Sequence, residues 1–194
     1  MTDPIEIPLR PLTAEGFAPF GQIVGGVPGT PPAFAAPQLE SWRLDFDVDG
    51  PVELMLIRYA HRRPFEFTAL ERHLNVTQTF VPLGGAASVM VVAPPTDPDD
   101  REGAPDPAAV RAFHVPGDRG IMLWRGTWHA LTRFPVHPPG AAFAFLTGRD
   151  TQRELERQRA DGTPPELTRV VDYRERRGIG FRVVDPDGLL DAAA

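Results

Sequence analysis

The sequence predicts a mainly β fold, in which short antiparallel strands form a sandwich or a barrel. Short apolar runs recur along the chain, and turn signals such as VDGP, LGG, PGDRG and HPPG separate them. The 23 prolines and 18 glycines are spread through the chain rather than gathered in one linker. Many short strands joined by Gly/Pro turns are typical of all-β sandwiches and barrels.

Seven apolar runs are expected to form strands, because each lies between turn signals and is rich in apolar residues. In chain order they are FGQIVGG, VELMLIRYA, TQTFVPL, ASVMVVAPP, RAFHVP, GIMLWRG and GAAFAFLTG. Two stretches predict helices: TAEGFAPFG, with Thr13 as its cap, and DTQRELERQRADG, with a glycine stop after Asp161. The segment 94–107, PPTDPDDREGAPDP, is expected to be an exposed acidic loop.

The 194 residues fit one domain with an extension. We expect residues 1–150 to form the main domain. Residues 151–194 are richer in charge, and we expect them to be a C-terminal extension that packs on the barrel or at an interface. No internal repeat of fixed period divides the chain further.

Composition excludes several classes of chemistry. The chain has no cysteine, which removes disulfides, thiolate nucleophiles and thiolate metal sites. All 20 basic residues are arginine, so a lysine Schiff base or a lysine general base is excluded. The net charge of −6 and the lack of a basic tract argue against a nucleic acid partner. No run of eighteen apolar residues predicts a membrane helix and no secretory signal is visible, so we expect a cytoplasmic protein.

One stretch, ALERHLNVTQTFVPLGG at 69–85, places polar side chains where apolar ones would pack better. Glu71 and His73 are two residues apart on an expected strand, so their side chains point to the same face. Gln78 can return to that face across a turn. A lone interior histidine is more often a hydrogen-bonded core residue than a ligand, and the wider spacing pattern is what favours a site here.

The spacing resembles that of cupins, small β-barrels with two sequence signatures on facing strands. The first signature, H-x-H-x(3–4)-E-x6-G, is matched by Glu71, His73, Gln78 and Gly85 as E-x-H-x4-Q-x6-G. In the second, Gly120, Gly126 and His129 align, with Trp124 in place of the usual proline and Arg133 in place of the usual asparagine. The resemblance implies a cupin-type jelly-roll barrel (a double-stranded β-helix) with a few short helices. Its metal-ligand quartet appears here in altered form as Glu71, His73, Gln78 and His129.

A more specific resemblance is to the ureidoglycolate lyase family, formerly called ureidoglycolate hydrolases. It is carried by LERHLNVTQTFVPLGG and GIMLWRGTWHALTRFP, by the opening PLRPLTAEGFAPFGQIV, and by LIRYA ahead of the ERH segment. It covers residues 5–150. The resemblance implies a homodimeric enzyme that splits ureidoglycolate into glyoxylate and urea in the breakdown of purines through allantoin. The acidic loop at 94–107 and the segment after Arg149 depart from the family pattern.

This chemistry assigns roles to the polar residues. Cleavage of a carbinolamine that bears a carboxylate needs a base, an acid and a cation. Glu71 and His73 are the first candidates for acid and base, and His129 is a second imidazole. Gln78 can hydrogen-bond the ureido group as donor and acceptor. The expected substrate-binding residues are Arg58, our choice for the carboxylate, then Arg133 and Trp128.

The sequence leaves alternatives open for the ligand of the quartet, for the position of Trp128 and for the function. Glutamine is an uncommon ligand for zinc or iron, so the quartet either holds a divalent metal or binds a polar substrate directly. Trp128 is either a rim residue or a core aromatic. Arg72 alternates to the outer face, where we expect it in solvent or at an interface. Other functions are a metal-dependent cupin isomerase or dioxygenase acting on another small carboxylate, and a non-catalytic small-anion-binding cupin.

Overall fold

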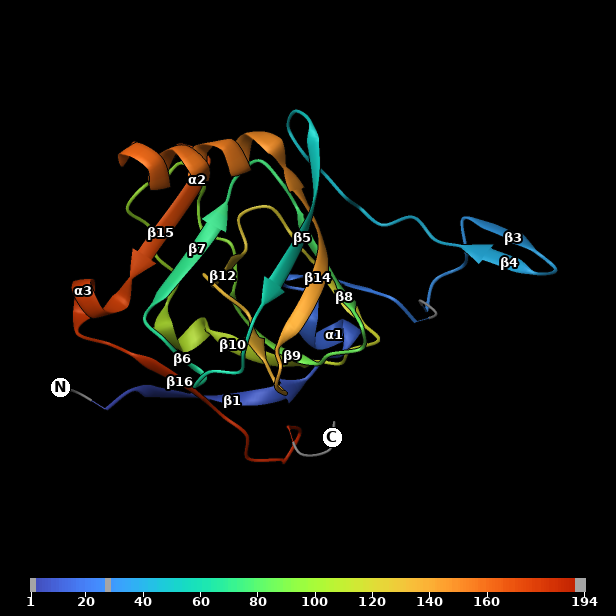
Figure 1. The fold of residues 1–194 in the computed structure, drawn as a ribbon, viewed down its shortest axis with the longest axis horizontal. Helices are drawn as coiled ribbons and strands as arrows, with labels where there is room; N and C mark the ends of the chain where they lie inside the picture. The colour runs from blue at the N-terminus through green and yellow to red at the C-terminus, as the bar shows by residue number, and fades with distance from the viewer. Residues whose placement is uncertain (1–2, 27–28, 191–194) are drawn as a thin grey trace.

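A computed structural model of the chain describes residues 3–26 and 29–190. Two β-sheets face one another and enclose a core, while a long helix crosses one end of the pair (Figure 1). This arrangement confirms the predicted class, a mainly β jelly roll with a few short helices. Among the described residues, no helix is both long enough and apolar enough to cross a membrane.

The larger sheet has the strand order β15-β7-β12-β9-β10-β1-β16-β6, and β13 pairs with β9. Its strands are mostly antiparallel, but β1 pairs in parallel with both β10 and β16. Their bounds are β1 (Ile5–Pro11), β6 (Glu66–Phe67), β7 (Ala69–His73), β9 (Ser88–Ala93), β10 (Arg111–Val115), β12 (Trp128–Ala130), β13 (Phe134–Pro135), β15 (Thr168–Asp172) and β16 (Phe181–Val184).

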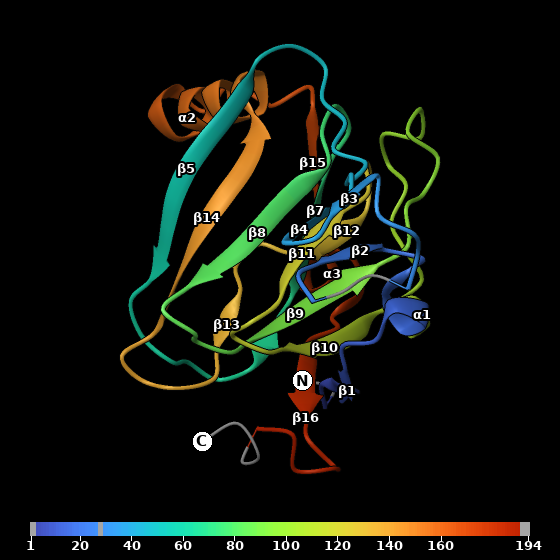
Figure 2. The same cartoon turned by 90° about the vertical axis from the view of Figure 1, so that its right-hand side faces the viewer.

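The smaller sheet has the order β2-β11-β8-β14-β5, with β5 as an edge strand (Figure 2). Its pairs are antiparallel. Its strands are β2 (Gly21–Val24), β5 (Val52–Tyr59), β8 (Gln78–Leu83), β11 (Gly120–Leu123) and β14 (Ala141–Gly148). A separate two-stranded hairpin is formed by β3 (Phe34–Ala36) and β4 (Leu39–Ser41).

The core lies on both faces of the larger sheet, and β9 shows this most clearly. All six of its residues are buried. Alternate side chains of a strand point to opposite faces, so Met90 and Val92 join the cluster that includes Phe80 and Phe143 of the smaller sheet. The intervening Val89, Val91 and Ala93 join the second cluster, which contains Trp128 and Phe181.

The two predicted helices begin and end near the capping and stop residues that the sequence indicated. In α1 (Ala14–Phe17), the predicted cap Thr13 accepts a hydrogen bond from the Gly16 amide at 3.1 Å. The long helix α2 (Arg149–Asp161) ends at Gly162, whose φ of +79° is the left-handed conformation that glycine favours. A 3₁₀ turn, η1 (Pro107–Ala109), and a short helix, α3 (Tyr173–Arg177), complete the set in the described part of the chain.

All seven predicted strands are present, and further strands lie where the sequence signals are weaker. β1 contains two prolines, which remove backbone donors and weaken a strand pattern. β15 and β16 belong to the C-terminal segment that we expected to be an extension. Both are paired within the larger sheet, β15 with β7 and β16 with β1. The acidic segment 94–106 forms no regular element, as expected.

Candidate active site

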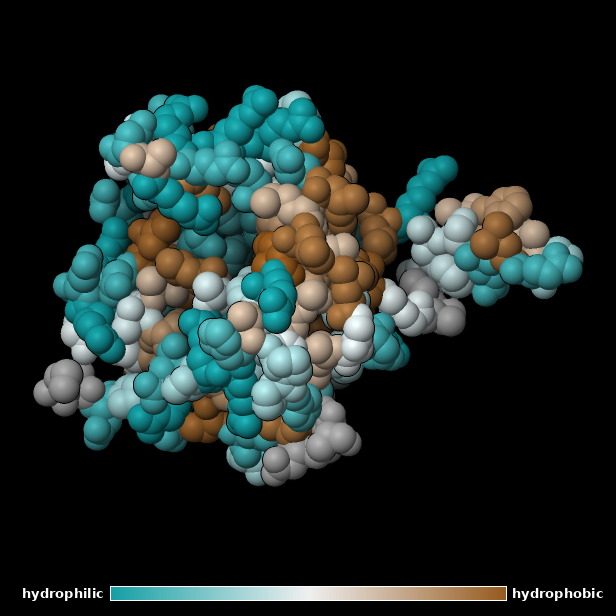
Figure 3. Space-filling model, viewed as in Figure 1, coloured by the Kyte–Doolittle hydropathy of each residue, from teal (hydrophilic) through white to brown (hydrophobic). Residues whose placement is uncertain are grey.

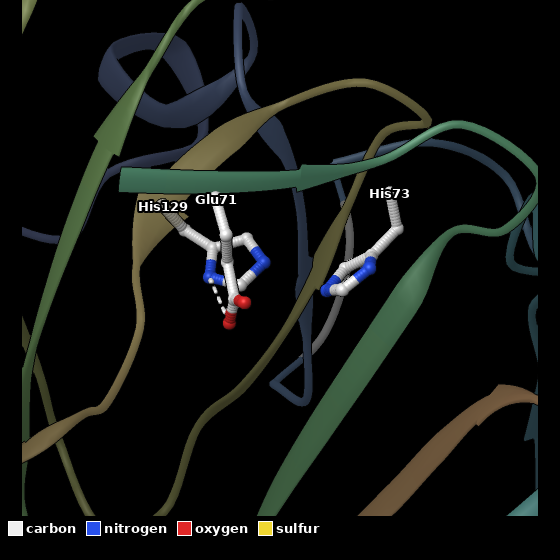
Figure 4. Close-up of side chains that lie close together, drawn as sticks. All are labelled: Glu71, His73 and His129. Atoms are coloured by element: carbon white, nitrogen blue, oxygen red, sulfur yellow. Dashed lines mark ion pairs between the residues drawn. The ribbon is translucent and has the colours of Figure 1, made fainter. Parts of the chain in front are cut away.

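Two neighbouring strands of the larger sheet place the central polar group. His129 on β12 is directly opposite Glu71 on β7. His73, two residues further along β7, points to the same side, and the imidazole rings of His73 and His129 lie 5.4 Å apart between centroids. The three side chains converge below the ribbon of β7 (Figure 4). Strand register therefore brings together the three residues that the spacing singled out.

These side chains line a cavity of about 180 Å³, which is room for one small molecule. Gln78 on β8 lines the same cavity, so all four residues of the predicted quartet meet there. The rest of the wall includes Tyr59, Phe80, Met90, Phe145 and Arg133, together with Gln152, Leu155 and Arg159 of α2.

The carboxyl group of Glu71 is largely shielded from solvent. About 16% of its side chain is exposed, and its Oε1 lies 3.9 Å from Nδ1 of His129. Burial raises the pKa of the Glu71 carboxyl to about 7, and the cationic Arg159 opposes that rise. Glu71 can therefore both give and take a proton near neutral pH.

His129 is held in one tautomer. Its Nδ1 lies 3.0 Å from the carbonyl oxygen of Ala130, which can only accept, so Nδ1 carries the hydrogen. Its Nε2 is then a lone-pair acceptor, and it is buried without a partner among the described residues. Burial lowers the pKa of His129 to about 4, so the ring is neutral at neutral pH.

His73 is oriented by the C-terminal part of the chain. Its Nδ1 lies 2.9 Å from the hydroxyl of Thr168, which stands opposite it on β15. Burial, reinforced by the nearby His129, lowers the pKa of His73 well below its ordinary value. The backbone carbonyl of His73 also accepts a hydrogen bond from the Gly126 amide at 2.8 Å. Thr168 had no distinguishing signal in the sequence and was not predicted.

Arg133 is a buried cation that forms no ion pair with any described residue. Its guanidinium packs against two aromatic rings, 4.6 Å from the centroid of Phe80 and 4.7 Å from that of Phe143. Only 2% of the residue is exposed, and neither Nη1 nor Nη2 has a hydrogen-bond partner among the described residues. Burial lowers the pKa of Arg133 to about 10, so it remains charged at neutral pH. Such an unpaired buried charge is costly unless a ligand satisfies it.

The helix α2 covers the mouth of the cavity. It follows β14 and crosses the end of the barrel towards β15 (Figure 1). Gln152, Leu155 and Arg159 are three and four residues apart, so they share one face of the helix, and that face lines the cavity. The sequence predicted this helix, but no signal placed it over the site.

Two predicted substrate-binding residues lie away from the cavity. Arg58 is exposed on β5, whose alternate neighbours Ile57 and Tyr59 are the ones that line the cavity. Trp128 is buried, with 1% exposure, and belongs to the core cluster on the opposite face of the larger sheet from His129. Of the two interpretations of Trp128, the structure agrees with the core aromatic.

The prediction that the Arg72 side chain lies in solvent or at an interface is wrong. The side chain does point away from Glu71, but it is fully buried rather than in solvent. Its guanidinium donates to the backbone carbonyls of Thr96, Asp97 and Asp100 at 2.8–3.0 Å. It also lies over the ring of Trp128, 4.8 Å from the centroid. The acidic loop folds back over this face of β7, so the outer side of the strand is covered.

The donor set suits a divalent metal. One ligand atom from each of Glu71, His73 and His129 lies within 4.8 Å of the others. Two imidazoles and one carboxylate form a common combination for divalent transition metals. The lone pair on Nε2 of His129 and the amide oxygen Oε1 of Gln78 are buried without a partner in the described part of the chain. These unsatisfied acceptors fit a cation, and they equally fit donors on a polar substrate.

Comparison with known proteins gives consistent matches. The family model described as ureidoglycolate lyase matches residues 4–163. A ureidoglycolate lyase from Rhodobacter capsulatus is 33% identical over 138 residues, which is 68% of this chain and 80% of the relative. One from Azotobacter vinelandii is 33% identical over 132 residues (62% and 73%), and one from Agrobacterium fabrum is 30% identical over 152 residues (75% and 84%). Among solved structures, RmlC from Streptococcus suis in complex with dTDP-D-xylose aligns with 74% of this chain and 67% of that chain, at 12% identity and a TM-score of 0.32.

Proposed function

Since the chain belongs to the ureidoglycolate lyase family, we propose that its cavity splits ureidoglycolate into glyoxylate and urea, a step of purine breakdown through allantoin. One observation supports this reaction above the others. The unpaired buried guanidinium of Arg133 lines the same small cavity as Glu71, His73 and His129. The site therefore contains a cation that can bind a carboxylate, together with side chains that can accept or donate a proton.

Arg133 is the proposed anchor for the substrate carboxylate. Guanidinium binds carboxylate through two parallel hydrogen bonds, and both terminal nitrogens of Arg133 are free to donate. The Phe80 and Phe143 rings pack against this guanidinium. This role replaces the one that the sequence suggested for Arg58, whose exposed side chain lies on the outer face of β5.

The reaction moves one proton from oxygen to nitrogen. The carbinol hydroxyl loses its proton as the carbonyl of glyoxylate forms, the carbon–nitrogen bond breaks, and the departing urea nitrogen takes a proton. We assign this transfer to Glu71, which as a carboxylate accepts the hydroxyl proton and then returns it to the nitrogen. A pKa of about 7 for Glu71 matches both steps at neutral pH.

The neighbouring side chains orient the substrate. The free Nε2 of His129 accepts a hydrogen bond, and the amide of Gln78 can both donate to the ureido carbonyl and accept from its nitrogen. As an alternative to these direct contacts, we propose that Glu71, His73 and His129, with the oxygen of Gln78 beside them, are the residues that would hold a divalent metal. Such an ion, when bound, would act as a Lewis acid on a substrate oxygen.

The test is to measure glyoxylate and urea from racemic ureidoglycolate, using purified protein with and without a chelator. Equal rates of release of the two products are expected, and loss of both rates after chelation, with recovery on adding a divalent metal, would establish the metal. Ammonia in place of urea would identify an amidohydrolase reaction and contradict the proposal. An absence of turnover, even with metals added back, would favour the small-anion-binding alternative.

We also propose a homodimer in the cytoplasm. Supporting the homodimer, β5 is a long edge strand whose outward side chains Leu54 and Leu56 are each 70% exposed. An exposed apolar edge strand of this kind is normally buried against another protein surface in solution. Sedimentation and cell fractionation would test the two parts separately, and a monomer at micromolar concentration would contradict the first.

A further inference from the structure

The hairpin of β3 and β4, which we call the arm, stands away from the two main sheets (Figure 1). Its strands pair with each other and with no further strand among the described residues. All six strand residues are exposed. A two-stranded hairpin is marginally stable in water unless it packs on something, so the arm needs a surface to rest on.

The arm has one apolar face. In its register Phe34 is opposite Ser41 and Ala36 is opposite Leu39, so these side chains lie on one side. Phe34 is 55% exposed and Leu39 is 57% exposed. The other side carries the pair Ala35 and Glu40.

The segment that follows the arm is anchored to the body of the protein at Asp47 and Asp49. Arg125 forms ion pairs of 2.7 Å with both Asp47 and Asp49 in the segment that returns from the arm to the body. In the backbone, the Thr77 amide donates to the Asp47 carbonyl and the Asp49 amide donates to the Asn75 carbonyl, each at 2.8 Å. The returning segment is thus anchored to the turn between β7 and β8 at residues 47–49.

A second unpartnered apolar surface lies on the outer face of the smaller sheet. Leu54 and Leu56 project from β5 and Leu83 from β8, and Leu83 is 45% exposed. Between them, Ala142 and Ala144 of β14 are in register with both neighbouring strands. Apolar side chains cover this region in Figure 3, and Figure 2 shows that the arm projects on the side towards which this face looks.

We propose that the apolar face of the arm packs on the outer face of β5, β14 and β8 of a second copy of this chain. Both surfaces belong to one sequence and stand apart within one chain. A two-fold axis brings each arm to the other copy's sheet, making a self-complementary contact of the kind that closes a dimer. The contact covers both the apolar edge strand and the hairpin, and it rests on the homodimer proposed above.

The absence of cysteine makes a direct test available. Leu39→Cys is combined in turn with Leu54→Cys, Leu56→Cys and Leu83→Cys, and the purified proteins are mildly oxidised. At least one pair is expected to give a covalent dimer on a non-reducing gel. The matched control places the arm cysteine on the opposite side, as Glu40→Cys with the same partners. It is expected to form little covalent dimer. Equal yields from the Leu39 and Glu40 series, or none from either, would overturn the docking.

Sedimentation separates the arm contact from the dimer itself. Phe34→Asp with Leu39→Asp is expected to weaken dimerisation roughly 100-fold, because both symmetry copies of the contact are lost. The control variant Glu40→Gln is expected to keep the wild-type dissociation constant. A wild-type protein that is monomeric would refute the homodimer. A wild-type dimer that the two aspartates leave unchanged would refute only the role of the arm.

Discussion

Glu71 and His129 are cross-strand partners on β7 and β12, and their side chains approach to 3.9 Å inside the cavity. Opposed residues of antiparallel strands share a face, so the backbone register fixes this pair before any side chain is placed. A carboxyl with a pKa near 7 thus stands beside an imidazole held neutral. The geometry places a carboxyl that titrates near neutral pH and a neutral imidazole on two neighbouring strands of the larger sheet.

Removing either imidazole should stop turnover. His73→Ala and His129→Ala are each expected to lower kcat by roughly 100-fold or more, because each loses a ligand or an orienting acceptor at the reacting group. The measurement is the rate of urea release, with circular dichroism to verify that the fold remains. His61→Ala, at an exposed position, is the control. Full activity in both site variants would refute the assignment.

Arg133→Met should separate stability from activity. It removes an unpaired buried charge, so the ligand-free protein is expected to gain roughly 1–3 kcal/mol in the free energy of unfolding. It also removes the carboxylate anchor, so kcat/KM should fall at least tenfold, with the loss mainly in KM. Arg58→Met is the matched control for activity and should leave KM unchanged. A large rise in KM in the Arg58 variant alone would restore the sequence-based choice.

Glu71 should make stability depend on pH. Its pKa rises from about 4.5 in the unfolded chain to about 7 in the folded one, so the folded state binds the proton more tightly. Its contribution is therefore full below pH 4.5 and is lost as the pH rises through 7. In chelator-treated protein, urea unfolding at pH 5 and pH 8 should show a loss of roughly 2–3 kcal/mol that Glu71→Gln abolishes. The exposed Glu156→Gln should behave as wild type, and an equal loss in the Glu71 variant would contradict the assignment.

Arg159 should tune Glu71 from the mouth of the cavity. Its positive charge lowers the pKa of Glu71, so Arg159→Ala is expected to move the acid limb of the kcat/KM profile to higher pH. It should also raise KM, because the helix face above the cavity loses a cation. Arg157→Ala, on the same helix but outside the cavity lining, is the control. Identical profiles for the two variants would exclude this influence.

The strand and turn signals predicted the mainly β class, and the resemblance to the cupin signatures predicted that Glu71, His73, Gln78 and His129 meet. Residues two apart on a strand share a face, and Glu71 and His73 follow that rule. The same rule places Trp128, directly before His129, on the opposite face. The sequence could not show which face of β5 turns towards the cavity, because both faces are apolar. Met55 and Ile57 point inwards, and Leu54 and Leu56 point outwards.

Long-range packing set the remaining features. Arg72 points away from the cavity as its parity requires, but only the tertiary structure shows that the acidic loop covers it. The burial of Arg133 could not be predicted from the sequence for a similar reason. Arg133 lacks any local sign of burial, and its two aromatic neighbours come from distant strands, β8 and β14.

The helix α2 brings a practical consequence. The groups assigned to bond breaking sit on strands fixed by two sheets, whereas the entrance is formed by Gln152, Leu155 and Arg159 on one helical face. The side chains at the mouth can therefore be changed without altering the strands that carry Glu71, His73 and His129. A library confined to the three positions on the helix would change which small acids are admitted, and the catalytic strands would be left intact.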